Sequence, residues 1–527
     1  MRAPAPAPAP PRRARVLLFV LPFSVFALLG ILWSLASPVF SVPDENAHAT
    51  KAIAQVRGQI IGYTLPDVRH IVVDLPEGYH YTQDTLCYAK HPDVSAGCAV
   101  DFGDGNGQAW FNTWVGAYNP VYYYLVGWPS LLFDGNASII AMRIASSLVG
   151  AALLAWAFLA ASSGARSRWM PLGVAFAAAP MSVYLIGAVN PNGVEFAAAV
   201  ALWAGTLRLL ETFRDGGGRP WLSRNALWAG VAVASILLVN ARALGPLWLL
   251  IVVGLCCFAV GWKAVRRLFT TGASYWWLGA IAVGGLFSLG WTLSGGSLSN
   301  QAEASDAPFV NGTFLQGFAY VLRTTPWYLQ QAVGFFGWFD TPLPVWAYWP
   351  FVAAFAVVVV LAFIATRRRS VLVLSAVVLS AILVPALVQG YSVHQTGIIW
   401  QGRYGLFLYL GITVVAAWLL SRDAGALDQV ATRAAWVVGA LLAGYGVIAF
   451  FLVLVRYVVA DDPVAEMLTA PQWQPPFGWL ALTAGYAVVS LGLVALAGLA
   501  TRWIVRREAV VPEVDEPSPL AEAPLRG

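Results

Sequence analysis

The residues most able to do chemistry follow the first long apolar segment, in residues 41–51, which read SVPDENAHATK. Asp44, His48 and Lys51 are four and then three residues apart, so on a helix they project from one face. A carboxylate there can deprotonate an attacking hydroxyl group as a general base, and cations can stabilise a departing phosphate. This chemistry suits sugar transfer from a lipid-linked phosphate donor. Asp44, Glu45 and His48 could also hold a divalent metal, a pattern of weak specificity.

The same segment fits a structural interpretation. Ser41 and Asp44 resemble a capping box at the start of a helix, and Pro43 is tolerated in a first turn. Acidic residues in that turn also interact favourably with the helix dipole. The sequence alone leaves both interpretations open.

Five arginines form a second group of candidates, at or near helix ends expected to face the same side as residues 41–51. An arginine near a membrane needs a partner or a route to water, so each could reach to the interface or bind an anion such as a lipid phosphate. Glu195, near such an end, could pair with one of them. The five are Arg143, Arg242, Arg323, Arg403 and Arg456.

Membrane-spanning helices must position these residues. Of the 527 residues, 59% are hydrophobic and 11% charged, whereas soluble domains carry roughly 25% charged residues. One soluble core cannot bury so much apolar surface, so the lipid bilayer is the expected solvent. The net charge of +5 comes from basic residues scattered through short loops, so it does not indicate a nucleic-acid partner.

Twelve apolar segments are long enough to span a bilayer. We therefore predict an all-α polytopic membrane protein of about twelve transmembrane helices. The predicted spans are 16–36, 137–162, 170–189, 193–212, 225–241, 243–261, 273–294, 345–366, 370–388, 403–420, 434–459 and 477–503.

The predicted organisation has a transmembrane domain between two tails. Residues 16–505 form the domain, and residues 37–136 form a large first extracytoplasmic loop within it. Residues 1–15 hold an Ala-Pro repeat, and residues 506–527 are acidic and Pro-rich, so both tails are expected to be disordered and cytoplasmic.

Residues 118–133 decide the topology. If this segment spans the bilayer, most basic loops face outside, whereas if it lies along the outer interface they face the cytoplasm. The positive-inside rule, its short length and its Tyr and Trp content favour the interface. The chain is then a multi-pass protein of the cell membrane with all five histidines outside. Cys87 and Cys98 also lie outside, where a disulfide between them is plausible.

Four motifs together resemble a bacterial membrane family catalogued as domain of unknown function 2142, over roughly residues 15–505. Their order and their place in the topology carry the resemblance. They are Pro43-Asp44-Glu45-x-x-His48, Asn119-Pro120-x-Tyr122-Tyr123, Val189-Asn190-Pro191-Asn192-Gly193 and Gln401-Gly402-Arg403-Tyr404.

That family resembles the GT-C glycosyltransferases, which place a catalytic Asp or Asp/Glu pair in the first extracytoplasmic loop and often use polyprenyl-phosphate sugars. The resemblance implies a GT-C-like fold, a juxtamembrane helix at 118–133, Asp44 as the base, and Glu45 as its neighbour or a metal ligand. It makes Arg403 the first candidate for the donor phosphate. The substrate-binding candidates are His48, Lys51, Tyr122, Asn190, Asn192, Glu195, Arg242, His394, Gln401, Arg403 and Tyr404.

The leading hypothesis is a membrane glycosyltransferase that moves a sugar from a polyprenyl-phosphate donor to a cell-envelope polysaccharide or lipid. The Ala, Arg and Gly content indicates a high-GC genome, such as an actinobacterial one. A transporter or flippase of lipid-linked sugars would need ionisable residues at mid-membrane depth, and few are seen. A non-catalytic partner in envelope assembly would tolerate replacement of the first-loop acids.

Overall fold

The computed structural model describes residues 9–66, 68, 70–102, 107–214, 220–295 and 307–510. Residues 1–8 and 511–527, which belong to the tails predicted to be disordered, lie outside this set. Within the set, α1 (Arg12–Ala36) starts before residue 16 and α18 (Trp479–Val510) continues past residue 505. Both terminal helices are therefore longer than the predicted spans.

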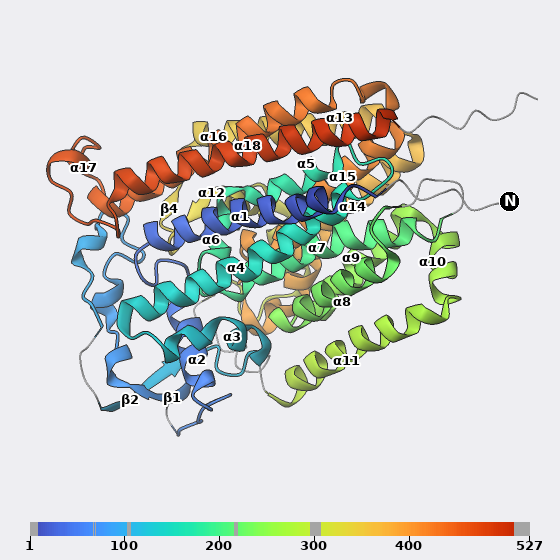
Figure 1. Cartoon of the computed structure of the whole chain (residues 1–527). Coiled ribbons are helices and arrows are strands. Elements are labelled where there is room, and N and C mark those ends of the chain that lie inside the picture. Colours follow the sequence, from blue (N-terminus) through green and yellow to red (C-terminus); the bar gives the residue numbers. More distant parts are fainter. Residues whose placement is uncertain are drawn as a thin grey trace, which may run out of the picture.

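Long helices lie side by side in one bundle (Figure 1). In the described part of the chain, ten helices are long and apolar enough to cross a membrane, or eleven if a pair bent by 116° counts as one span. The predicted class, an all-α multi-pass membrane protein, is confirmed. Besides α1 and α18, these helices are α4 (Gly135–Ser162), α7 (Pro191–Glu211), α8 (Arg224–Ala241), α11 (Gly272–Ser294), α13 (Trp349–Ala365) with the turn η7 (Val345–Tyr348), α14 (Arg368–Thr396), α15 (Leu406–Asp423) with the turn η8 (Gly402–Gly405), α16 (Ala431–Val459), and the bent pair α9 (Gly245–Val260) and α10 (Trp262–Phe269).

The predicted span 170–189 is a broken segment. It consists of α5 (Met170–Ala175), the turn η5 (Phe176–Ala178) and α6 (Pro180–Ile186). Pro180 has no N–H group and forces Ala179 into an extended conformation, which stops the helix. The segment is buried, with α5 against α15 and α6 against α1, so protein rather than lipid surrounds the irregular backbone.

A helix that hydropathy did not predict, α12 (Phe314–Gly334), packs against α14 and η8. It carries Arg323 and Pro326 among many polar residues, so it does not qualify as an apolar span. The short antiparallel strands β3 (Phe335–Phe336) and β4 (Thr341–Pro342) follow it and form a tight turn.

The described part of residues 37–134 gathers at one end of the bundle, which we call the first-loop end, and α1 begins at the other (Figure 1). The strands β1 and β2 pair antiparallel, with Ile71 opposite Thr113, and Cys87 and Cys98 form a disulfide with a Cα–Cα distance of 6.1 Å. The elements there are α2 (Glu45–Val56), β1 (Ile71–Pro76), η1 (Glu77–Tyr79), η2 (Gln83–Leu86), η3 (Ala96–Cys98), β2 (Gln108–Thr113), α3 (Pro120–Gly127) and η4 (Trp128–Leu131), while α17 (Glu466–Thr469) and the turn η9 (Gly425–Leu427) complete the described helices.

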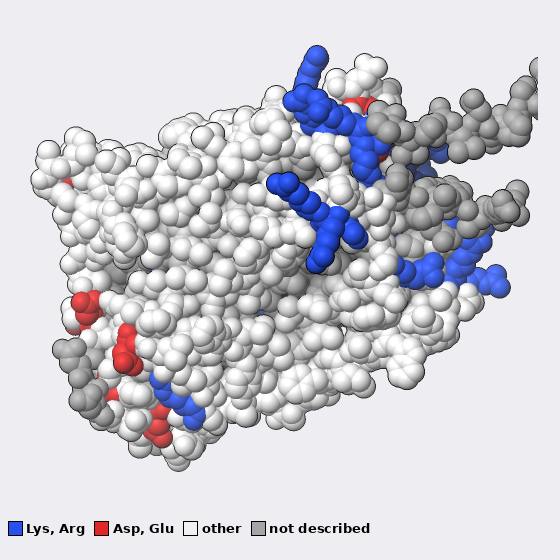
Figure 2. Space-filling model, in the orientation of Figure 1, with Lys and Arg blue, Asp and Glu red and all other residues white. Residues whose placement is uncertain are grey.

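Residues 118–133 contain the eight-residue α3 and the turn η4, and they are not among the candidate spans. Surface charge separates along the bundle. On the face drawn in Figure 2, Lys and Arg gather toward the end where α1 begins, and Asp and Glu lie mainly at the first-loop end.

Candidate functional site

Asp44, in the first of the four motifs, is the N-cap residue that precedes α2. Asp44 has φ +67°, a left-handed conformation that is uncommon for a residue with a Cβ atom. Its side chain makes no capping hydrogen bond to α2. Among the described residues, the Ser41 hydroxyl has no hydrogen-bond partner either. The capping box is therefore absent, and the Asp44 carboxylate is directed away from its own helix.

That carboxylate meets Arg403. The Nη2 of Arg403 donates to Oδ2 of Asp44 over 2.7 Å, and Nη1 lies 3.4 Å from the Pro43 carbonyl oxygen. Asp44 keeps 31% of its side chain exposed, whereas Arg403 keeps 4%. In the described part of the chain, Arg403 Nε has no hydrogen-bond partner. The pair is thus open on the carboxylate side and leaves one guanidinium donor unused.

The Gln-Gly-Arg motif explains how Arg403 reaches a residue 359 positions away in the sequence. Gly402 lies against α12, where its N–H donates to Oε1 of Gln331 over 2.8 Å. A Cβ atom at residue 402 would lie 2.1 Å from the Tyr328 carbonyl oxygen, so only glycine fits. This close contact fixes the turn that carries Arg403.

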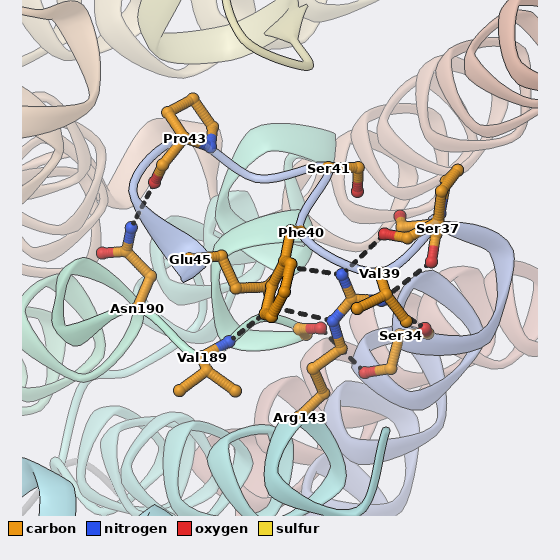
Figure 3. A network of polar contacts seen from close by, with 12 residues as sticks. Ser34, Ser37, Val39, Phe40, Ser41, Pro43, Glu45, Arg143, Val189 and Asn190 are labelled. Atoms are coloured by element: carbon orange, nitrogen blue, oxygen red, sulfur yellow. Dashed lines mark hydrogen bonds and ion pairs between the residues drawn. The ribbon is translucent and has the colours of Figure 1, made fainter. Parts of the chain in front are cut away.

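Glu45 faces the other way, into the protein (Figure 3). Arg143 of α4 donates from Nε to Oε1 over 2.7 Å and from Nη2 to Oε2 over 2.5 Å, and both side chains are fully buried. The backbone N–H of Val189 also donates to Oε1, over 2.9 Å. Because both carboxylate oxygens are occupied, we place Glu45 in the scaffold of the site, unlike the predicted catalytic role.

His48 and Lys51 follow on the buried face of α2. The Nδ1 of His48 lies 2.8 Å from the Tyr123 hydroxyl. Burial, together with the positive charges of Arg242, Arg403 and Lys51, lowers the pKa of His48 well below its usual value, so the ring is neutral at pH 7.

Lys51 connects α2 to the rest of the first loop. Its Nζ donates to the carbonyl oxygens of Ile60 and Gly116 over 2.8 and 2.6 Å. Burial lowers the pKa of Lys51 to about 7, so it is close to half protonated at neutral pH.

The alternative of a metal held by Asp44, Glu45 and His48 does not fit this geometry. In the residues that the structure describes, no three His, Cys, Asp or Glu side chains are grouped closely enough to hold a metal ion. Glu45 is engaged by Arg143, and His48 by Tyr123. The three side chains therefore do not form one donor set.

The Asn-Pro-Asn-Gly motif holds the start of α7 against the Asp44 turn. Asn190 caps the helix by accepting from the Asn192 N–H over 3.0 Å, and its Nδ2 donates to the Pro43 carbonyl oxygen over 3.1 Å. A Cβ atom on Gly193 would lie 2.6 Å from the Leu185 carbonyl oxygen, so the motif needs glycine there.

A chain of polar contacts leads from α7 to Arg403. Asn192 donates to Glu195 over 2.9 Å and accepts from Arg242 over 3.1 Å. The Arg242 guanidinium lies 4.4 Å from the centre of the Tyr404 ring, and that of Arg403 lies 5.4 Å from it. The structure thus brings together five predicted substrate-binding residues beside Asp44.

In the described part of the chain, no side-chain hydrogen bond joins three other candidates to Asp44 or Arg403. Tyr122 is buried, with its hydroxyl 3.4 Å from that of Ser146 on α4. The Gln401 Oε1 atom is buried, with no partner in the described part of the chain. His394 is exposed near the end of α14.

Sequence reasoning missed two aromatic residues and an apolar pocket. Tyr123, next to the predicted Tyr122, contacts His48, and the Phe339 ring lies 5.7 Å from the Arg403 guanidinium. Tyr123 is the second tyrosine of the Asn119 motif, and that motif could have indicated it. No motif in the sequence indicated Phe339. The pocket adjoins Arg403 and is also lined by Pro43, Met181, Tyr184, Leu185, Gln331, Phe335, Gly337 and Phe339.

The remaining arginines of the predicted group have other roles. Arg456 donates to the carbonyl oxygens of Val94 and Tyr88 over 2.6 and 2.7 Å and lies 3.4 Å from Asp340, so it holds the disulfide-bonded part of the first loop. Arg323 is exposed on α12. Only Arg242 and Arg403 of the five lie in the candidate site.

Comparisons with known proteins place the chain in a family. No curated protein matches its sequence. Its structure is similar to the crystal structure of ArnT from Cupriavidus metallidurans bound to undecaprenyl phosphate, with 16% identity, a TM-score of 0.43, and coverage of 92% of this chain and 78% of that one. The family model of a predicted membrane protein, DUF2142, matches residues 26–412. The match confirms the resemblance inferred from the four motifs, and the chain belongs to this family.

Proposed function

We propose that this protein is a GT-C-type membrane glycosyltransferase that transfers a sugar from a polyprenyl-phosphate donor to a cell-envelope glycan or lipid. Asp44 is the general base, and Arg403 and Arg242 bind the donor phosphate. The observation that carries the proposal is the Asp44–Arg403 pair: an accessible carboxylate in a strained backbone conformation beside a buried guanidinium whose Nε has no hydrogen-bond partner among the described residues. Backbone strain of this kind concentrates at functional sites.

Positive charge around the pair supports an anionic substrate. Arg242, Arg403 and Lys51 all act on the pKa of His48, so they share one electrostatic environment. Arginine suits phosphate because its planar fork makes parallel charge-assisted hydrogen bonds. The phosphate group of a lipid-linked sugar donor matches this feature.

The charge separation in Figure 2 supports an extracytoplasmic site. The cytoplasmic loops of membrane proteins carry an excess of Lys and Arg. The first-loop end carries few of them on the face shown, so we assign it to the outside. Both termini are then cytoplasmic, and donor and acceptor meet at the outer leaflet.

Transfer at this site proceeds as a direct displacement. The acceptor hydroxyl oxygen attacks the anomeric carbon of the donor while Asp44 accepts the hydroxyl proton. The bond from the anomeric carbon to the phosphate oxygen breaks, and its electron pair leaves with polyprenyl phosphate. Arg403 and Arg242 stabilise the negative charge that develops there.

The test uses the full chain in lipid nanodiscs with a panel of polyprenyl-phosphate hexoses and pentoses and a cell-envelope fraction as acceptor. Release of polyprenyl phosphate is measured by mass spectrometry. We expect Asp44→Asn to lower the rate by about 100-fold or more, while Asp93→Asn, an exposed first-loop carboxylate, keeps the wild-type rate. An active Asp44→Asn protein would exclude Asp44 as the base. Flipping of lipid-linked sugar in proteoliposomes without transfer would favour a transporter instead.

A further inference from the structure

Arg143 uses every donor that it has. Besides the two bonds to Glu45, its Nη1 donates to the carbonyl oxygens of Ser34 and Ser37 over 3.0 and 2.8 Å, and its Nη2 donates to that of Pro38 over 2.8 Å. Five N–H groups therefore join α4 to the end of α1, to the connection that follows it, and to the first residue of α2 (Figure 3).

Two contacts from the segment before α7 flank Asp44. On one side Val189 donates to the Glu45 carboxylate, and on the other Asn190 donates to the Pro43 carbonyl oxygen. The residues before and after Asp44 are thus both tied to the same buried segment. Asp44 lies between two fixed points, with a left-handed φ of +67°.

A buried ion pair is weak evidence for stability, because apolar residues of similar volume often do as well. The Glu45–Arg143 pair instead sets geometry. Its partners are backbone carbonyl oxygens and one N–H of the elements that meet at the Asp44 turn. Glu45 itself has no exposed surface and cannot reach a substrate.

We propose that Glu45 and Arg143 are positioning residues that hold Asp44 in its left-handed conformation, with its carboxylate against Arg403. The expected loss of rate rests on the proposed function, whereas the expected change in the Asp44 conformation does not. A carboxylate that moves by about 1 Å can lose about 100-fold in rate. Binding of the donor, which depends on Arg242 and Arg403, changes less.

Glu45→Gln tests the proposal, because it keeps the shape of the side chain and removes its charge. The matched control is Glu211→Gln at the opposite end of α7. Glu211 likewise pairs with a buried arginine, Arg208, over 2.7 Å and accepts an indole N–H from Trp418 over 2.6 Å. Both variants break a comparable pair, but only one pair touches the Asp44 turn.

For Glu45→Gln in nanodiscs we expect kcat to fall about 100-fold with the KM for the donor within about 3-fold. Glu211→Gln should keep kcat within about 3-fold of wild type at a similar loss of thermal stability. Equal effects of the two variants on kcat would overturn the proposal. If Glu45→Gln does not accumulate, Glu45→Asp takes its place with an expected loss of about 10-fold.

A second experiment determines the structure of the variant and does not depend on enzyme activity. In a cryo-EM structure of the Glu45→Gln protein, Asp44 should leave the left-handed region and lose its bond to Arg403. An unchanged Asp44 turn would overturn the proposal. A wild-type protein without transfer on any donor would count against the proposed function alone, since this experiment reads the conformation directly.

Discussion

Asp44 and Glu45 are neighbours in the sequence, and each pairs with an arginine from a distant helix, yet the two pairs differ in every physical respect. Glu45 and Arg143 are fully buried, every N–H group of Arg143 donates within the protein, and both carboxylate oxygens of Glu45 accept hydrogen bonds. Asp44 keeps a third of its side chain exposed, and the Nε of Arg403 has no hydrogen-bond partner in the part of the chain that the structure describes. One pair is complete in the free protein, whereas the other has capacity left for a ligand.

Two neighbouring residues therefore have different roles: Glu45 stabilises the structure, and Asp44 is available for chemistry. A closed pair can hold the backbone but cannot react without being opened. An open pair contributes little to folding, since water competes with it, but it can exchange its partner for a substrate. The comparison therefore predicts that substitutions in the two pairs have different consequences.

The largest effect is expected for Arg143→Ala. It leaves Glu45 buried and uncompensated and removes donors from three carbonyl groups, so the free energy of unfolding should fall by about 3–5 kcal/mol. Denaturant unfolding of the purified protein measures it. Arg403→Ala should cost less, because its partner Asp44 is partly exposed and can be hydrated. Equal losses for the two variants would contradict the comparison.

A smaller effect is expected for Arg403→Lys. Lysine keeps the charge but loses the fork that can bond Asp44 and a phosphate together, so affinity for polyprenyl phosphate should fall about 10-fold, or about 1.4 kcal/mol. The melting temperature should stay near that of wild type. Binding measured by native mass spectrometry decides this, and unchanged affinity would remove Arg403 from the phosphate site.

The smallest effect concerns Lys51, whose pKa of about 7 lies below its usual value. Lys51 is charged below pH 7 and loses its charge as the pH rises, so attraction for an anion should weaken from pH 6 to 8. A polyprenyl-phosphate sugar suits the measurement, because this diester keeps one negative charge over that range. We expect a fall in affinity of about 3-fold.

Lys51→Arg is the control for this pH dependence. Arginine remains protonated throughout, so the affinity profile should become flat. A profile that keeps its slope in the variant would show that another group titrates.

Much of the fold followed from the sequence, because hydropathy reports directly on the lipid-facing surface. Hydropathy mispredicted the segments that are surrounded by protein rather than by lipid. Residues 170–189 are apolar but buried, so Pro180 could break the helix without exposing backbone to lipid. Hydropathy did not predict the helix α12, because it carries Arg323 and many uncharged polar residues.

The candidate site was predictable in part. The motifs indicated Asp44, Arg403 and the α7 start, because close backbone contacts at Gly402 and Gly193 leave a sequence signal. The helical spacing did not, because Asp44 precedes α2 and its carboxylate is directed away from that helix. The opposite orientations of Asp44 and Glu45 were not predictable. They depend on one left-handed residue and on an arginine 98 positions away from Glu45.

The central claim is that the Asp44–Arg403 pair opens for a phosphate while the Glu45–Arg143 pair stays closed. A cryo-EM structure of the full chain in nanodiscs with polyprenyl phosphate tests it most directly. We predict phosphate oxygens within hydrogen-bond distance of Arg403, a released Asp44 carboxylate, and an unchanged Glu45–Arg143 pair. Phosphate bound elsewhere, with Asp44 still on Arg403, would contradict the account.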